Sequence, residues 1–149
     1  MLIVSPECDT SWPDGLLPCP LGDPWSVRLA GARSGRPAIE LYEAGDLVDV
    51  ISSTTIARRL LRGARAAGPE AARTDAAPRA IAWGRLPAGG SSPAVVFSGP
   101  LGRDARAAAV IVPVSWCWIA VADGRFARVT VRTPDEALRR RLARRLPWC

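Results

Sequence analysis

A run of apolar residues from Ala107 to Val131 constrains the fold of this chain more than any other feature. Its sequence is AAAVIVPVSWCWIAVADGRFARVTV, and no charged side chain occurs between Ala107 and Ala122. These roughly 16 uncharged residues fall short of the ~20 that a membrane-spanning helix needs. Val and Ile favour a pleated strand, and Pro113 disfavours a helix. We therefore expect strands here and no membrane span.

The run turns at Asp123-Gly124, a dipeptide typical of a tight type I′ turn. Counting outward from this turn predicts a β-hairpin in which Trp118 faces Val129 and Val121 faces Phe126. One face of that hairpin would be wholly apolar, comprising Trp116, Trp118, Ala120, Ala127, Val129 and Val131. We expect this face to form the core.

Other parts of the chain also show the pattern of strands. Trp25 to Ala32 and Ala38 to Glu43 alternate between apolar and polar residues, which predicts a second hairpin. Asp46 to Ile51, Ala80 to Leu86 and Ala94 to Ser98 read as further strands between Gly/Pro turns.

Two segments are predicted to be helices. Ser52 to Thr55 supply N-cap candidates for a helix through about Ala66, with Ile56, Leu60 and Ala64 forming an apolar stripe. Near the C-terminus, Thr133-Pro134-Asp135-Glu136 fits a capping box before an Arg-rich helix. That helix would place Leu138, Leu142 and Leu146 against the sheet.

The predicted fold class is therefore α+β and β-dominated. Antiparallel hairpins would form a small sandwich or barrel, with one mid-chain helix and a C-terminal Arg-rich amphipathic helix. The domain prediction has an N-terminal segment over 1–66, a flexible Ala/Pro-rich connector over 67–79 and an antiparallel β domain with its helix over 80–149. One continuous domain is the alternative. The 48% hydrophobic content supports a packed core.

Composition disfavours an enzyme without excluding one, and it rules out serine or cysteine hydrolases that rely on a His partner. The 20 basic residues are all Arg, the net charge is +6, and histidine is absent. The lack of histidine removes the commonest general base and metal ligand, so we expect no metal or other cofactor. The remaining catalytic candidates are Glu40, Tyr42, Glu43 and Asp46, with Asp49 nearby, and an exposed acidic face is the commoner use of such residues.

Four cysteines leave the redox state open. Cys8, Cys19, Cys117 and Cys149 allow two disulfides in three connectivities, or four reduced thiols. The N-terminal residues lack the basic and apolar regions of a secretory signal, which predicts a cytoplasmic location as the sequence is written. A start further upstream would allow an extracytoplasmic one.

The second half of the chain also resembles a known type of domain. Trp83-Gly84-Arg85-Leu86-Pro87-Ala88-Gly89 precedes a Val-rich strand, and Val121-Ala122-Asp123-Gly124-Arg125-Phe126 follows later. These motifs resemble small β-domains of uncharacterised, often envelope-associated proteins of high-GC bacteria. The resemblance implies a β-sandwich-like shape and an extracytoplasmic setting, and it implies no functional residues.

Three functions follow as hypotheses. The first is a non-enzymatic binding or structural module that contacts an unknown protein partner through a β-sheet surface. The second is nucleic-acid binding through the Arg-rich C-terminal segment. The third is a carboxylate-dependent enzyme. The predicted contact residues for a nucleic acid or another partner are Arg139, Arg140, Arg141, Arg144 and Arg145. An Arg-rich surface produced by GC-rich codons is the alternative explanation for these residues.

Overall fold

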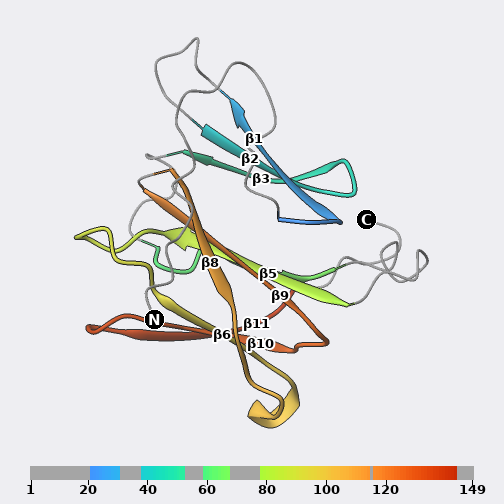
Figure 1. The fold of residues 1–149 in the computed structure, drawn as a ribbon, viewed down its shortest axis with the longest axis vertical. Coiled ribbons are helices and arrows are strands. Elements are labelled where there is room, and N and C mark those ends of the chain that lie inside the picture. The colour runs from blue at the N-terminus through green and yellow to red at the C-terminus, as the bar shows by residue number, and fades with distance from the viewer. Residues whose placement is uncertain (1–20, 31–37, 53–58, 68–77, 115, 144–149) are drawn as a thin grey trace.

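The computed structural model describes residues 21–30, 38–52, 59–67, 78–114 and 116–143. Within these ranges the chain forms eleven strands in three antiparallel sheets (Figure 1). The strands are β1 (Trp25–Ala30), β2 (Ala38–Glu43), β3 (Asp46–Ser52), β4 (Gly63–Ala66), β5 (Arg79–Arg85), β6 (Ala94–Ser98), β7 (Arg106–Ala107), β8 (Ala109–Val114), β9 (Cys117–Asp123), β10 (Arg128–Arg132) and β11 (Ala137–Arg141). A 3-10 turn, η2 (Pro100–Gly102), follows β6.

The sheets stack in three layers. Sheet A has the order β1-β2-β3, sheet B the order β4-β5-β9-β8, and sheet C the order β11-β10-β6-β7. Sheet B is the central layer, because alternate residues of its strands point into different cores (Figure 1). Trp118 and Ala120 of β9 face sheet C, whereas Cys117 and Ile119 face sheet A.

This arrangement explains the uninterrupted apolar run in β9. A strand that is buried on both faces needs apolar residues at every position, whereas a strand with one solvated face alternates. Five residues of β9 from Cys117 to Ala122 are buried, and Val121 is half-buried. The antiparallel, β-dominated character of the predicted fold is confirmed.

The predicted hairpin turn at Asp123-Gly124 is wrong. Strand β9 pairs with β5 and β8, and β10 pairs with β6 and β11. Residues Gly124 to Ala127 cross from sheet B to sheet C, and Phe126 is buried between the sheets against Phe97. Strand β9 already has neighbours on both edges, so no edge is left for β10.

Four of the six apolar residues assigned to one face share one core. Trp118, Ala120, Val129 and Val131 all lie in the cluster between sheets B and C. They meet across the gap between two sheets rather than as neighbours on one sheet. Trp116 packs instead against the core between sheets A and B.

The N-terminal strands follow the sequence prediction. Strand β1 pairs with β2, and β2 pairs with β3, with Trp25 opposite Glu43 and Ile39 opposite Ile51. The chain turns between β2 and β3 at Ala44 and Gly45, both with positive φ. Residues 31–37, which connect the two strands of the predicted hairpin, lie outside the described part.

Both predicted helices are wrong where the structure describes them. The segment expected to be a mid-chain helix contains β4, which pairs with β5, while residues 53–58 lie outside the described part. Gly63 in β4 lies directly against the ring of Trp83 in β5. A side chain at position 63 would not fit, because its Cβ would come within 2.3 Å of that ring. Packing of small β4 residues beneath Trp83 therefore overrides the helix propensity of the Arg, Leu and Ala residues.

The segment expected to be the C-terminal helix forms β11 in the described part, and residues 144–149 lie outside it. The capping hydrogen bonds do form, since Thr133 Oγ1 accepts from the amides of Asp135 and Glu136 at 3.3 and 3.2 Å. However, the amide of Thr133 donates to the carbonyl of Glu136 at 2.9 Å, which closes a hairpin between β10 and β11. The same local hydrogen bonds thus begin a turn and not a helix.

Sheets B and C are joined at both sides. Beyond β11, Ala143 forms a parallel bridge to Arg65, with Ala143 N donating to Ala64 O and Ala66 N donating to Ala143 O at 3.0 Å each. On the other side, β7 in sheet C continues through Ala108 into β8 of sheet B. The predicted connector over 67–79 links β4 to β5, which are paired neighbours, and residues 68–77 lie outside the described part.

Searching the described residues finds no helix of the length and apolarity needed to cross a membrane.

Candidate functional site

The predicted acidic group is divided between the two faces of sheet A. Glu40 and Tyr42 lie on the outer face, and the Tyr42 hydroxyl donates to the Glu40 carboxylate. This hydrogen bond, together with desolvation, raises the pKa of Tyr42. Glu43 and Asp49 lie on the inner face, in line with the buried Leu41 and Ile51. The structure therefore does not gather the predicted carboxylates into one site.

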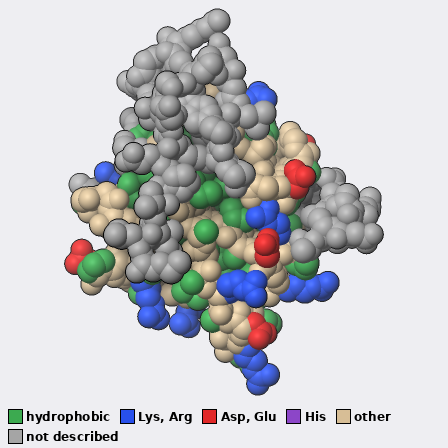
Figure 2. All heavy atoms as spheres, viewed as in Figure 1, with side chains coloured by type: hydrophobic (Ala, Val, Ile, Leu, Met, Phe, Trp, Pro, Cys, Tyr) green, Lys and Arg blue, Asp and Glu red, His purple; other side chains and the backbone are tan. Residues whose placement is uncertain are grey.

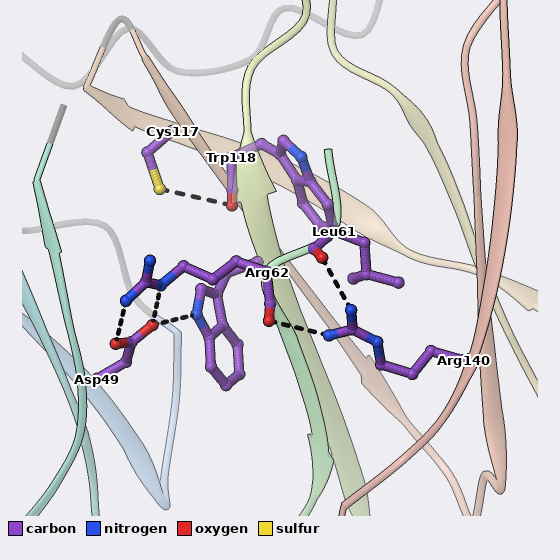
Figure 3. Close-up of polar contacts among 7 residues, drawn as sticks. Asp49, Leu61, Arg62, Cys117, Trp118 and Arg140 are labelled. Carbon is purple, nitrogen blue, oxygen red and sulfur yellow. Dashed lines mark hydrogen bonds and ion pairs between the residues drawn. The ribbon is translucent and has the colours of Figure 1, made fainter. Parts of the chain in front are cut away.

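The two inner carboxylates hold sheet A to sheet B. Arg62 donates to Asp49 through Nε at 2.6 Å and through Nη2 at 2.9 Å, and Trp83 Nε1 donates to Asp49 Oδ2 at 2.8 Å (Figure 3). The bidentate hydrogen bond to Asp49 raises the pKa of Arg62.

Glu43 makes a second set of such contacts. It accepts from Trp25 Nε1 at 3.1 Å and from Arg65 Nη2 at 3.4 Å. Its side chain is only 4% exposed. The carboxylates of Asp49 and Glu43 are thus both engaged in structural contacts, and they do not form a free pair for acid–base chemistry.

Cys117 lies in the same layer as these contacts. It is a free, buried thiol, and desolvation followed by the charge of Asp49 raises its pKa to about 12, partly opposed by Arg62. A thiol with that pKa stays protonated at neutral pH and is a poor nucleophile. Cys8, Cys19 and Cys149 lie outside the described residues, so the predicted disulfides stay predictions.

Side chains suited to a metal ion are also not grouped. Over the described ranges, no three His, Cys, Asp or Glu residues are placed to hold one.

The outer face of sheet C is a different kind of surface. Its register places Arg141 opposite Arg128 and Arg139 opposite Thr130, and Arg132 lies four residues along β10 from Arg128. Alternation along the strands puts Arg128, Arg132, Arg139 and Arg141 on the solvent side, away from the buried Val129 and Val131. We call these four residues the arginine face.

The arginine face carries one sign of charge. Its other described positions are small or neutral: Ala94, Val96, Ser98, Ala107, Thr130 and Ala137. None of its four guanidinium groups has a hydrogen bond or ion pair to a described residue. Asp135 and Glu136 lie in the turn at one end of the face. Figure 2 shows Arg side chains along the lower part of the molecule, where sheet C lies.

Three outcomes follow for the predicted contact arginines. Arg139 and Arg141 lie on the arginine face, whereas Arg140 points to the other side of β11 and donates to the carbonyls of Arg62 and Leu61 (Figure 3). Arg144 and Arg145 lie outside the described residues.

Sequence reasoning missed Arg128 and Arg132. The signal was present in the alternating segment Arg128-Val-Thr-Val-Arg132, because an even spacing puts both arginines on one side of a strand.

Comparison with protein-family models, with curated proteins and with solved structures finds no match to this chain. The resemblance of its second half to small β-domains of envelope-associated proteins therefore stays a prediction.

Proposed function

We propose that this chain is a non-enzymatic binding module that binds an acidic macromolecule through the arginine face. The observation that carries the proposal is the placement of four arginines on one sheet face that has no described acidic residue. Elsewhere, Arg62, Arg65 and Arg79 pair with Asp49, Glu43 and Asp123.

The register of β10 and β11 adds a second argument. Arg128 and Arg141 lie directly opposite each other, and like charges at such positions destabilise a sheet by a few tenths of a kcal/mol or more. An acidic ligand would neutralise both side chains and remove that cost. Among the described candidates for catalysis, Glu43 and Asp49 are meanwhile engaged in ion pairs with Arg65 and Arg62.

The proposal is tested by removing positive charge from the arginine face and comparing the effect with the removal of the same charge elsewhere on the surface. Two acidic polymers of unrelated chemistry, poly-L-glutamate and heparin, serve as probes in a fluorescence binding assay. Replacing all four residues of the arginine face by Gln should weaken binding by about tenfold or more, because the positive field of that face is lost.

The matched control removes the same charge elsewhere. Arg28, Arg59, Arg103 and Arg125 are exposed and lie outside the arginine face, so their replacement by Gln should weaken binding much less. Equal losses in both variants, or no binding by the unmodified protein, would refute the proposal.

A further inference from the structure

The chemistry of the arginine face also indicates which acidic macromolecule fits it. Protein–protein interfaces centre on buried aromatic or large aliphatic anchors surrounded by a polar rim. The described exposed large hydrophobics are Leu47, Val50, Leu101 and Leu138, and none of them lies on the outer face of sheet C. Thr130 and Ala137 lie among the arginines, and Ala94, Val96 and Ser98 lie beside them on β6.

Nucleic-acid interfaces have the opposite character. They are more polar and much more positively charged than protein interfaces, and most of their hydrogen bonds go to phosphate and sugar. Arginine presents a planar fork of donors that matches phosphate oxygens. A surface of unpaired arginines without an apolar anchor therefore suits a phosphodiester backbone better than a protein.

The same face also distinguishes between forms of nucleic acid. Single strands bind to surfaces where bases stack on aromatic side chains. The described outer face of sheet C has no aromatic residue, since Phe97 points into the core. The strands present arginines to the backbone and no group placed to stack on a base.

The spacing of the arginines suits a broad, rigid polyanion. Arg128 and Arg132 lie four residues apart in one strand, which is about 13 Å at 3.3 Å per residue. Arg139 and Arg141 lie on the adjacent strand, about 4.8 Å away. The neutral residues between them are too short to hold a duplex away from the guanidinium groups.

We propose that the arginine face binds the phosphodiester backbone of double-stranded nucleic acid without reading its sequence. This inference rests on the proposed function and names its ligand. Binding through the four arginines would release counterions from the duplex, so the affinity should depend steeply on salt.

The test measures the salt dependence of binding to two short DNA duplexes of unrelated sequence. Four contacts give a slope of about −3.6 for log K against log salt, since each phosphate contact contributes about −0.9. Both duplexes should bind with equal affinity. Replacing all four arginines by Gln should bring the slope close to zero.

Arg128 is half-buried, so replacing it in the four-residue variant could disturb the fold. A second variant that keeps Arg128 controls for this effect. Replacing Arg132, Arg139 and Arg141 by Gln while keeping Arg128 should leave a slope of about −0.9, with an unchanged circular-dichroism spectrum. The control variant at Arg28, Arg59, Arg103 and Arg125 should keep the full slope.

The remaining outcomes separate the two proposals. Tighter binding to poly-L-glutamate than to duplex would overturn the nucleic-acid inference while leaving the proposed function in place. Tighter binding to single-stranded than to double-stranded DNA, or discrimination between the two duplexes, would also overturn it. Failure to bind either polymer class would overturn both proposals.

Discussion

The Cys117 side chain lies between sheets A and B, where Asp49 and Arg62 meet, and its surroundings favour the neutral thiol. Desolvation is the largest cause of its raised pKa, and the nearby carboxylate of Asp49 adds to the effect. Burial here therefore suppresses the reactivity that an exposed cysteine would have. A reactive cysteine would need a positive environment and access to solvent.

The raised pKa predicts a loss of stability at alkaline pH. The thiol ionises near pH 9.0 when unfolded and near pH 12 when folded, so its contribution is fully present below pH 9 and is lost between these values. Within that window the free energy of unfolding should fall by about 1.4 kcal/mol per pH unit from this group. Urea unfolding of the unmodified protein and of Cys117→Ala at a series of pH values measures the difference. Parallel pH profiles would contradict the prediction.

At the scale of the secondary-structure elements, β11 illustrates how far the sequence predicts the fold. Leu138 and Leu142 lie four residues apart, which fits one face of a helix and equally one face of a strand, because four is an even number. Leu142 packs against the core between sheets B and C. Leu138, in contrast, is 38% exposed, and all five positions of β11 are exposed. The spacing therefore determines neither the burial of this element nor whether it is a helix or a strand.

The other elements differ in whether the local sequence pattern or the arrangement of the whole sheet determines them. Strands with regular alternation, such as β1 and β2, and the apolar β9 are predictable from local pattern. The partners of β9 and β10 depend on which edges remain open in the whole sheet, and a tight-turn dipeptide carries no such information. The arginine face was partly predictable, since its residues are visible in the sequence but its extent across two strands requires the register.

Strand β11 is attached to the body partly through the side chain of Arg140. Arg140 donates to the carbonyl of Arg62 at 2.9 Å and to that of Leu61 at 3.2 Å. Replacing Arg140 by Met should lower the free energy of unfolding by about 1–2 kcal/mol, because two carbonyls lose a charged donor. Thermal or urea unfolding measures the change.

Arg139 supplies the matched control. It is the preceding residue of the same strand, but its side chain lies on the solvent side and makes no hydrogen bond or ion pair with a described residue. Arg139→Met should change stability by less than about 0.5 kcal/mol. Equal destabilisation by the two substitutions would show that the hydrogen bonds of Arg140 do not hold the strand.

At the scale of the whole molecule, the short segment 59–62 connects all three layers. Its backbone bonds to β5, since Arg62 N donates to Trp83 O and Arg85 N donates to Arg59 O at 2.9 Å each. Leu60 O accepts from Trp118 Nε1 at 2.9 Å. Gly84 permits this close approach, because a Cβ there would lie 1.8 Å from Leu60 O.

Arg62 extends the same connection in two directions. Its side chain reaches Asp49 in sheet A, and its carbonyl accepts from Arg140 in sheet C (Figure 3). Arg62, beside the central sheet, is thus one of the residues that connect both outer layers to it. Apolar contacts supply the bulk of each core, and these polar contacts fix how the layers are aligned.

This role predicts a measurable coupling between Asp49 and Arg62. Their side chains are 18% and 23% exposed, and the bidentate geometry is favourable, so a double-mutant cycle with Asp49→Asn and Arg62→Met should give a coupling energy of about 1–3 kcal/mol. Asp49→Asn alone should also weaken the contact with Trp83 Nε1, which a change in Trp fluorescence would report. Arg79 and Asp123 provide the control cycle, because Asp123 is 67% exposed and that pair should couple by under about 1 kcal/mol. If the two cycles give the same coupling, the Asp49–Arg62 pair does not fix the alignment of sheet A.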